Sequence, residues 1–273
     1  MRKVLLAVAA VAFVAILALL AYDLLAGEPD ERGAHVEHLE VASELTGATR
    51  PLTAVVPAGV DDGERRPLLI FLHGRGGSPD DNLSDELFRA LEQLGDRAPV
   101  IAYPDGGEGS YWHDRRDGAW GTYLMKEVLP TALRELPADP RRVAIGGISM
   151  GGFGALDAAR LHPGRFCAVG AHSPALWRTG AETAPGAFDD AEDFAAHDVI
   201  ATAAADPGAY AAQPLWVDGG QADPFDPGID AFVAALQANG VPISAHRWPG
   251  GHEGDYWRAH VDEYLRFYAR SCG

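Results

Sequence analysis

The chain has 273 residues, with 22 lysine or arginine side chains against 39 aspartate or glutamate side chains and a formal net charge of −17. Such an acidic surface excludes nucleic acid as a partner, because the phosphate backbone would repel it. The two cysteines are too few for a disulfide framework.

The amino terminus, residues 1–27, predicts a membrane segment. Arg2 and Lys3 precede an unbroken apolar run over 4–22, which as a helix is about 28 Å long, close to the thickness of a hydrocarbon core. Cleavage after residue 26 would put Leu24 at the unfavourable −3 position. We therefore favour an uncleaved signal-anchor over a cleaved signal peptide. The basic flank places the rest of the chain outside the cytoplasm, and both interpretations predict an exported protein.

Residues 28–273 predict a single α/β domain. Strand-like and helix-like runs alternate, which indicates a mostly parallel central sheet with helices on both faces. His35 and His38 have the spacing of a metal pair, but no cysteine or carboxylate cluster supports them, and a solvated early strand is favoured. The segment 178–210 breaks the alternation and is rich in Ala, Asp, Gly and Pro. It predicts a lid over the site, with a mobile acidic surface segment as the alternative.

The first candidate site loop follows the apolar run 68–72. The sequence His-Gly-Arg-Gly-Gly from His73 exposes backbone N–H groups of the kind that form half of an oxyanion hole. Arg75 is the preferred N–H donor and Gly76 the second choice. For His73 we favour a structural role, in which it props the loop by a hydrogen bond, over a catalytic one.

The strongest motif is Gly147-Ile148-Ser149-Met150-Gly151, between a strand-like and a helix-like run. This is the pattern of a nucleophile elbow, in which a sharp turn exposes a serine and small neighbours let the chain and substrate approach. Ser149 is therefore the candidate nucleophile. The N–H of Met150 points to where an oxyanion would form.

An acid and a base should follow the serine, each after a strand. Asp223 lies on a loop after the strand-like run 214–218, and His252 lies on a glycine-rich loop after the run 243–248. Asp218 and Asp226 are the alternative acids. His172, His246 and His260 are each interpreted as structural or surface histidines.

Aromatic and cysteine positions complete the list of candidates. Tyr111, Trp112 and Trp177 are candidate substrate contacts that would form an aromatic wall, with packing in the core as the equal alternative. Cys167 falls in a buried strand and Cys272 next to the chain end. Two unpaired thiols are predicted rather than a bridge between them.

These motifs together resemble the putative-esterase family of α/β-hydrolases. That family includes esterase D-like S-formylglutathione hydrolases, feruloyl and acetyl xylan esterases, and secreted mycolyltransferases. The resemblance extends over about residues 35–270, and its residues match as follows: Phe71-Leu72-His73-Gly74, Ser110-Tyr111-Trp112, the run 123–130, the run 147–152, Gly219 to Asp223, Gly251-His252 and Tyr256-Trp257. It implies an α/β-hydrolase fold and the roles of nucleophile for Ser149, acid for Asp223 and base for His252. The chain lacks the cysteine-bearing loop of the glutathione-thioester hydrolases, which argues against that subclass.

The expected function is that of a serine esterase, which cleaves a carboxylic ester through an acyl-enzyme on Ser149. This mechanism requires no metal and no organic cofactor. The expected partner is a small-molecule or carbohydrate ester, and contact with a membrane is expected only through residues 1–27. The alternatives are an acyltransferase to a carbohydrate alcohol in the cell envelope and a non-catalytic envelope or binding protein on the same fold. The sequence predicts no oligomeric state.

Overall fold

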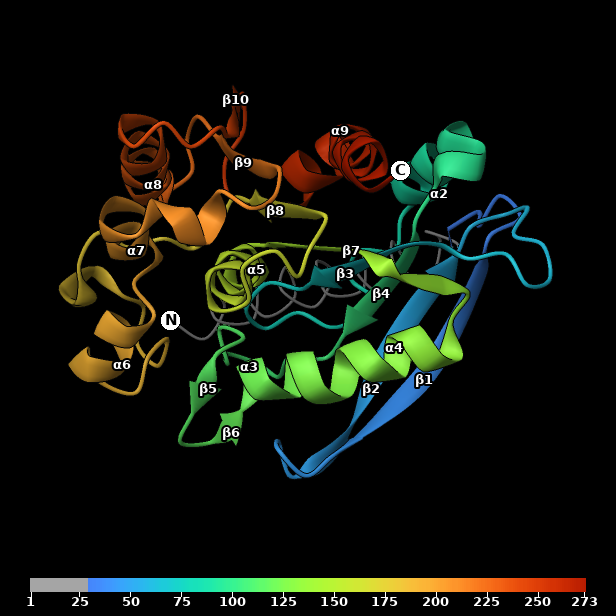
Figure 1. Ribbon diagram of the computed structural model, residues 1–273, viewed down its shortest axis with the longest axis horizontal. Coiled ribbons are helices and arrows are strands. Elements are labelled where there is room, and N and C mark those ends of the chain that lie inside the picture. The colour runs from blue at the N-terminus through green and yellow to red at the C-terminus, as the bar shows by residue number, and fades with distance from the viewer. Residues whose placement is uncertain (1–28) are drawn as a thin grey trace, which may run out of the picture. The chain divides into compact units, whose positions relative to one another are not determined.

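The central sheet runs through the described part of the chain, which in this computed structural model is residues 29–273. Its strands lie in the order β1-β2-β4-β3-β7-β8-β9-β10 (Figure 1). β1 and β2, and β2 and β4, are antiparallel, and every pair from β4 to β10 is parallel. The strand bounds are β1 His35–Ser43, β2 Ala48–Val56, β3 Arg66–Leu72, β4 Val100–Pro104, β7 Ala138–Ile148, β8 Ala168–His172, β9 Leu215–Gly220 and β10 Ser244–Trp248.

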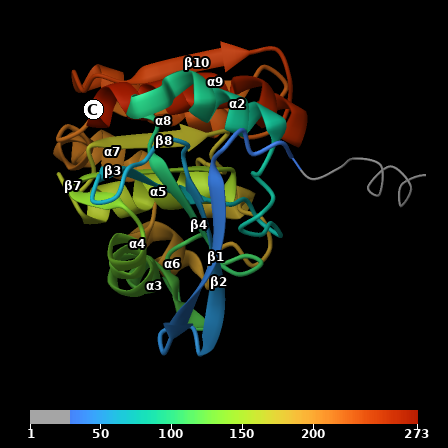
Figure 2. The same cartoon turned by 90° about the vertical axis from the view of Figure 1, so that its right-hand side faces the viewer.

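Helices cover both faces of the sheet, as Figures 1 and 2 show from two sides. On one face, α2 and α9 pack against each other and against the sheet; on the other lie α4, α5, α7 and α8. The other elements are the short β5–β6 hairpin, α3 with the π-helical turn 124–128, α6, and short 3₁₀ turns at Gly95–Arg97, Gly180–Glu182 and Pro207–Tyr210. Their bounds are β5 Asp114–Arg115, β6 Gly118–Ala119, and α2 Asp85–Leu94, α3 Trp120–Tyr123, α4 Leu129–Glu135, α5 Met150–Leu161, α6 Ala191–Ala196, α7 Val199–Ala205, α8 Asp226–Ala238 and α9 Gly254–Cys272.

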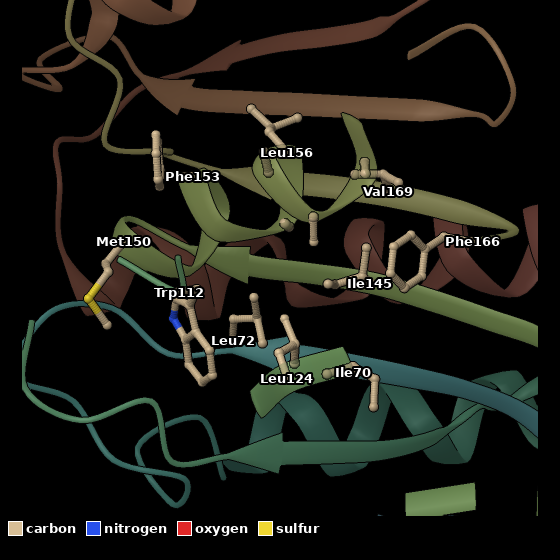
Figure 3. Close-up of a cluster of buried hydrophobic side chains, with 14 of the residues drawn as sticks. Ile70, Leu72, Trp112, Leu124, Ile145, Met150, Phe153, Leu156, Phe166 and Val169 are labelled. Carbon is tan, nitrogen blue, oxygen red and sulfur yellow. The ribbon is translucent and has the colours of Figure 1, made fainter. Parts of the chain in front are cut away.

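Two hydrophobic cores follow from this arrangement. The central parallel strands are apolar on both sides because helices cover both sides, and Leu68 and Leu69 on β3 face opposite cores. Figure 3 shows the larger core, where Leu156 of α5 meets Val169 of β8. Burial of these side chains holds α5 against the sheet, and therefore also fixes the position of Ser149, which precedes α5. The expected α/β-hydrolase fold with a mostly parallel sheet is confirmed.

The prediction of two unpaired cysteines was wrong, because Cys167 and Cys272 form a disulfide with their Cα atoms 5.3 Å apart. α9 begins beyond the carboxyl end of β10 and packs back along β8. Its last turn therefore reaches the residue just before β8. A sequence separation of 105 residues hides this proximity.

The predicted amino-terminal anchor, with its apolar run 4–22, lies outside the described residues. Within 29–273, no helix is both long enough and apolar enough to cross a membrane. The segment 178–210, expected to form a lid, contains α6 and α7, and it packs beside α5 and α8. None of its residues lines the cavity described below, and its role as a lid stays a prediction.

Candidate active site

Ser149 occupies a sharp turn between β7 and α5. Its backbone has φ +53° and ψ −114°, a left-handed conformation that costs a non-glycine residue on the order of 1–3 kcal/mol. Hydrogen bonds on both sides hold this strained turn. The Ser149 N–H donates to the carbonyl of His172 at 3.0 Å, and its carbonyl accepts from the N–H of Ala175 at 3.0 Å.

The flanking glycines are required by close contacts of the backbone. A Cβ at Gly147 would lie 2.6 Å from the carbonyl oxygen of Leu72, and one at Gly151 would lie 2.0 Å from the same atom. Real Cβ atoms essentially never approach so closely, and here the obstacle is backbone that cannot swing aside. The motif therefore lets α5 start directly against the end of β3.

The structure brings Ser149, His252 and Asp223 together. His252 Nε2 lies 2.8 Å from Ser149 Oγ, and His252 Nδ1 lies 3.0 Å from Asp223 Oδ2. The Asp223 side chain is fully buried, whereas the histidine ring is 21% exposed. In this order of hydrogen bonds a histidine can remove the serine proton while the carboxylate fixes its tautomer.

The loops that carry the acid and the histidine are joined to each other. Asp223 lies between β9 and α8, and its Oδ1 accepts a hydrogen bond from the N–H of Phe225 at 2.8 Å. The N–H of Gln221 donates to the carbonyl of Trp248 at the end of β10, and the N–H of Ala222 donates to that of Gly250 in the loop that follows, each at 2.9 Å. These bonds hold the acid loop against the histidine loop.

The two alternative acids are engaged elsewhere. Asp218 is buried inside β9, where its carboxylate contacts His172 rather than His252. Asp226 begins α8 and forms an ion pair with Arg247 of β10. Neither is hydrogen-bonded to His252, so among the three the geometry favours Asp223.

The two predicted oxyanion-hole donors are the N–H groups of Met150, the residue after the serine, and of Arg75 on the loop after β3. Their role stays a prediction. Met150 is the first residue of α5, where a helix leaves its N–H groups without helical partners. Gly76, the second choice for the other half of the hole, donates its N–H to the Glu108 carbonyl at 2.8 Å and is thus not free. Arg75 lines the cavity at Ser149, and a Cβ at Gly74 would touch the serine Cβ at 3.4 Å.

His73 props this loop, as the sequence predicts. Its side chain is buried, and its Nε2 accepts a hydrogen bond from the N–H of Gly106 at 2.9 Å. Its Nδ1 lies 2.7 Å from the carbonyl oxygen of Gly74, to which it donates. The imidazole therefore ties the end of β3 to the loop that follows β4.

An apolar cavity of about 350 Å³ opens beside Ser149 and His252. It lies between α2, α9 and the loop after β3. Its lining includes the polar side chains of Arg75, Asp81 and Arg258. Its apolar lining includes Phe71, Leu83, Leu87, Ile148, Trp257, Val261 and Leu265. Sequence reasoning missed this cavity, because the apolar residues on α2 and α9 have the helical periodicity of ordinary core residues.

None of the three predicted aromatic contacts lines this cavity. Trp112 is only 1% exposed, and its ring donates from Nε1 to the carbonyl of His73 at 3.3 Å (Figure 3). Tyr111 is also buried, and burial raises the pKa of its hydroxyl. Its ring packs against Trp177 with a centroid distance of 5.5 Å. Trp177 in turn packs against Phe225, whose ring contacts His252, with centroid distances of 5.4 Å and 5.0 Å.

Fold and site together define a class of protein. A mostly parallel sheet with a serine on the turn after β7, an aspartate after β9 and a histidine after β10 is the architecture of the α/β-hydrolases. Residues 43–268 match the family described as "Putative esterase". The chain belongs to this esterase family.

Curated relatives include both a hydrolase and an acyltransferase. The chain is 28% identical over 184 residues to S-formylglutathione hydrolase of Bos taurus, a match that covers 61% of this chain and 64% of that protein. It is also 28% identical over 218 residues to the diacylglycerol acyltransferase/mycolyltransferase Ag85A of Mycobacterium gordonae, with 76% and 58% covered. These matches span less than two thirds of each relative's length.

Solved structures agree on the fold. A ferulic acid esterase superposes with a TM-score of 0.76 at 22% identity, and covers 87% of this chain and 98% of that one. An S-formylglutathione hydrolase from Agrobacterium tumefaciens gives 0.74 at 19% identity, with 91% and 99% covered. At such identities the likeness supports the fold and leaves the substrate open.

Proposed function

We propose that the chain is a serine esterase that hydrolyses a small carboxylic ester through an acyl-enzyme on Ser149. The observation that carries this proposal is the continuous hydrogen-bonded series from Ser149 Oγ through His252 to Asp223, at 2.8 Å and 3.0 Å. Membership of the esterase family supports it independently.

In the acylation step, His252 Nε2 takes the proton of Ser149 Oγ as the oxygen attacks the ester carbonyl. Asp223 stays ionised, accepts a hydrogen bond from the Nδ1–H of His252 and stabilises the imidazolium that forms. The N–H groups of Met150 and Arg75 bind the oxyanion of the tetrahedral intermediate. His252 then returns its proton to the leaving alcohol, and the acyl group remains on the serine.

In the second half of the reaction, His252 activates a water molecule against the acyl-enzyme, and the serine leaves with the proton. The cavity beside Ser149 is the proposed site of the acyl group, because its lining is largely apolar and it opens at the nucleophile. Acyl groups that are short or aromatic suit a cavity of about 350 Å³.

Transfer to an alcohol is the second candidate. The apolar cavity favours it, since an acyl chain held out of water lives longer before hydrolysis, and the similarity to a mycolyltransferase supports it. Product analysis with and without an acceptor sugar separates the two. Ester formation on the sugar at the expense of free acid would identify a transferase.

Covalent labelling tests the proposal directly. A fluorophosphonate probe should modify the wild-type chain on the peptide that contains Ser149 and should leave Ser149→Ala unlabelled. The matched control is Ser173→Ala, which should label normally. Ser173 is buried, and within the described residues its hydroxyl has no hydrogen-bond partner. Absence of labelling in the wild type would favour the non-catalytic binding protein instead.

We also propose that the domain acts outside the cytoplasm. The Cys167–Cys272 disulfide supports this location, because such bonds persist in oxidising compartments. Cell fractionation and protease treatment of intact cells test it. The domain should be digested from outside, whereas a protected cytoplasmic form would contradict export.

A further inference from the structure

Three metal-binding side chains converge on the α5 face of the sheet, apart from the triad. One ligand atom from each of His113, Asp193 and His197 lies within 4.8 Å of the other two. His113 Nε2 is 3.2 Å from Asp193 Oδ2, and His197 Nε2 is 3.8 Å from Asp193 Oδ1. Asp193 and His197 stand one helical turn apart at α6, and His113 comes from the loop before β5. The fold thus joins residues that lie 80 positions apart.

The opposite nitrogen of each histidine is held by an acceptor. His197 Nδ1 lies 2.8 Å from Asp157 Oδ2, and His113 Nδ1 lies 3.4 Å from the carbonyl oxygen of Tyr111. Arg160 binds the other oxygen of Asp157 at 2.7 Å and approaches His197 Nδ1 only to 3.4 Å. A histidine that donates from Nδ1 presents the lone pair of Nε2, and an acceptor at Nδ1 is typical of histidines that bind a metal through Nε2.

In this tautomer the cluster lacks a positive charge at its centre. Two nitrogen lone pairs and a carboxylate face each other. Within residues 29–273, the Asp193 carboxylate has one further hydrogen bond, which it accepts from the N–H of Asp189 at 2.7 Å. The His113 side chain is fully buried, and those of Asp193 and His197 are 13% and 15% exposed. The cluster is therefore largely shielded from bulk water. A cation among the three atoms would turn mutual repulsion into coordination.

We propose that His113, Asp193 and His197 bind one divalent transition-metal ion, of which zinc is the best fit. Two imidazoles and one carboxylate are ligands for zinc and similar ions, whereas calcium and magnesium prefer oxygen alone. Zinc bonds of about 2.0–2.1 Å in a tetrahedron separate ligand atoms by roughly 3.4 Å. The 3.2 Å from His113 Nε2 to Asp193 Oδ2 is close to that value, and one ligand atom of each residue lies within 4.8 Å of the other two, so small side-chain shifts would bring all three to one ion. Water would complete the coordination.

The ion would be structural rather than catalytic. None of its three ligands lines the cavity at Ser149. The ligands instead join the loop before β5 to α6 in the segment 178–210, and Asp157 of α5 contacts His197. The salt bridge between Arg115 of β5 and Asp189, at 3.1 Å, joins the neighbouring strand to the same segment. Loss of the ion would therefore loosen the segment 178–210.

Metal binding is measured on the purified full chain after treatment with a chelator. Titration with zinc chloride in a calorimeter should show one ion bound per chain, and zinc should raise the midpoint of thermal unfolding. Cobalt(II) should give the visible absorption bands of a four- or five-coordinate site. Zinc should also slow proteolysis within 178–210. If the wild-type chain binds neither zinc nor cobalt, the proposal is overturned.

Variants locate the site. Asp193→Asn and His197→Gln are both partly exposed positions, so their folding can be checked by circular dichroism, and each should abolish zinc binding and the cobalt bands. His35→Gln, an exposed histidine on β1, is the matched control and should bind zinc as the wild type does. Undiminished binding in a folded double variant Asp193→Asn/His197→Gln would place the metal elsewhere and overturn the assignment.

Discussion

Asp218 Oδ1 lies 2.6 Å from His172 Nδ1 in the interior of the sheet, where neither side chain is exposed to solvent. The two residues are register partners on the neighbouring strands β8 and β9. Trp216 Nε1 donates to the same carboxylate oxygen at 2.8 Å. This second histidine–aspartate pair resembles the one in the active site but has no serine at its other nitrogen. Its role is therefore structural.

The other carboxylate oxygen of Asp218 accepts hydrogen bonds from side chains of α9. The hydroxyl groups of Tyr256 and Tyr264 donate to Oδ2 at 3.1 Å and 2.9 Å, while that of Tyr268 lies 2.9 Å from His172 Nε2. Burial raises the pKa of all three tyrosines, so they remain neutral donors. Because α9 follows directly after His252, this network also holds the catalytic histidine loop in place.

Asp218→Asn should therefore destabilise the fold. The amide would place a donor against several donors, at a cost of about 3 kcal/mol in the free energy of unfolding. Urea denaturation followed by circular dichroism measures it. Asp226→Asn, which removes a partly exposed ion pair with Arg247, is the control and should cost under about 1 kcal/mol. Equal stability of the two variants would contradict the role given to Asp218.

Ser149→Ala should abolish ester turnover and leave the fold intact. Loss of the nucleophile of a triad costs on the order of 10⁴- to 10⁶-fold in kcat. Hydrolysis of p-nitrophenyl acetate measures the rate, and circular dichroism checks the fold. Residual activity above a tenth of the wild type would show that another residue attacks the ester.

Asp223→Asn should slow catalysis far more than it affects stability. The amide would donate to His252 and favour the wrong tautomer, which costs roughly 10⁴-fold in other triads. Asp218→Asn, assayed at a temperature where it is folded, should retain far more activity. A collapse of kcat in Asp218→Asn with a normal rate in Asp223→Asn would reverse the assignment of the acid.

The triad could be predicted because its signals are local. Ser149 and His252 each lie among glycines directly after a strand, and parallel strands bring such loops to one edge of the sheet. The structure refines the boundaries, since β9 extends to Gly220 and α8 begins at Asp226. Asp223 thus stands on a shorter loop than the sequence indicates.

The missed features all depend on contacts between distant segments. Trp112 is buried rather than part of an open wall because two glycines make room for it. A Cβ at Gly106 or at Gly154 would lie 2.4 Å from an atom of this side chain. The cavity likewise forms between α2 and α9, which are far apart in sequence. Periodicity identifies the apolar side of each helix but not the gap between two of them.

Acid should weaken the start of β7 through Asp139. Hydrogen bonds from the backbone and side chain of Arg141, and from Arg142, lower the pKa of this carboxyl to about 2. Its folded pKa lies below the ordinary value, so its contribution to stability is complete above about pH 4 and is lost as the pH falls toward 2. Urea denaturation across this range should show the difference in free energy of unfolding between the wild type and Asp139→Asn shrinking as the pH falls. A difference that is independent of pH would contradict the lowered pKa.

Acyl-chain preference should follow the cavity beside Ser149. Val261 of α9 lines it, and Val261→Trp would fill part of the space that an acyl chain occupies. Exclusion of two methylene groups from the cavity costs about 1.6 kcal/mol at about 0.8 kcal/mol each, which is roughly a 15-fold loss in kcat/KM. In the variant, kcat/KM should fall by this factor on the longest ester that the wild type hydrolyses efficiently. Its kcat/KM on the acetate ester should stay near that of the wild type.

A panel of p-nitrophenyl esters from C2 to C16 measures this preference. For the wild type, kcat/KM should fall at least tenfold between C4 and C12, because a cavity of about 350 Å³ limits the length of chain it can hold. Leu161→Trp, at an exposed position on the end of α5 away from the cavity, is the control and should leave the profile unchanged. A rise in kcat/KM toward C12 would show that long chains leave the cavity by another path. The mycolyltransferase-like reaction would then become the favoured one.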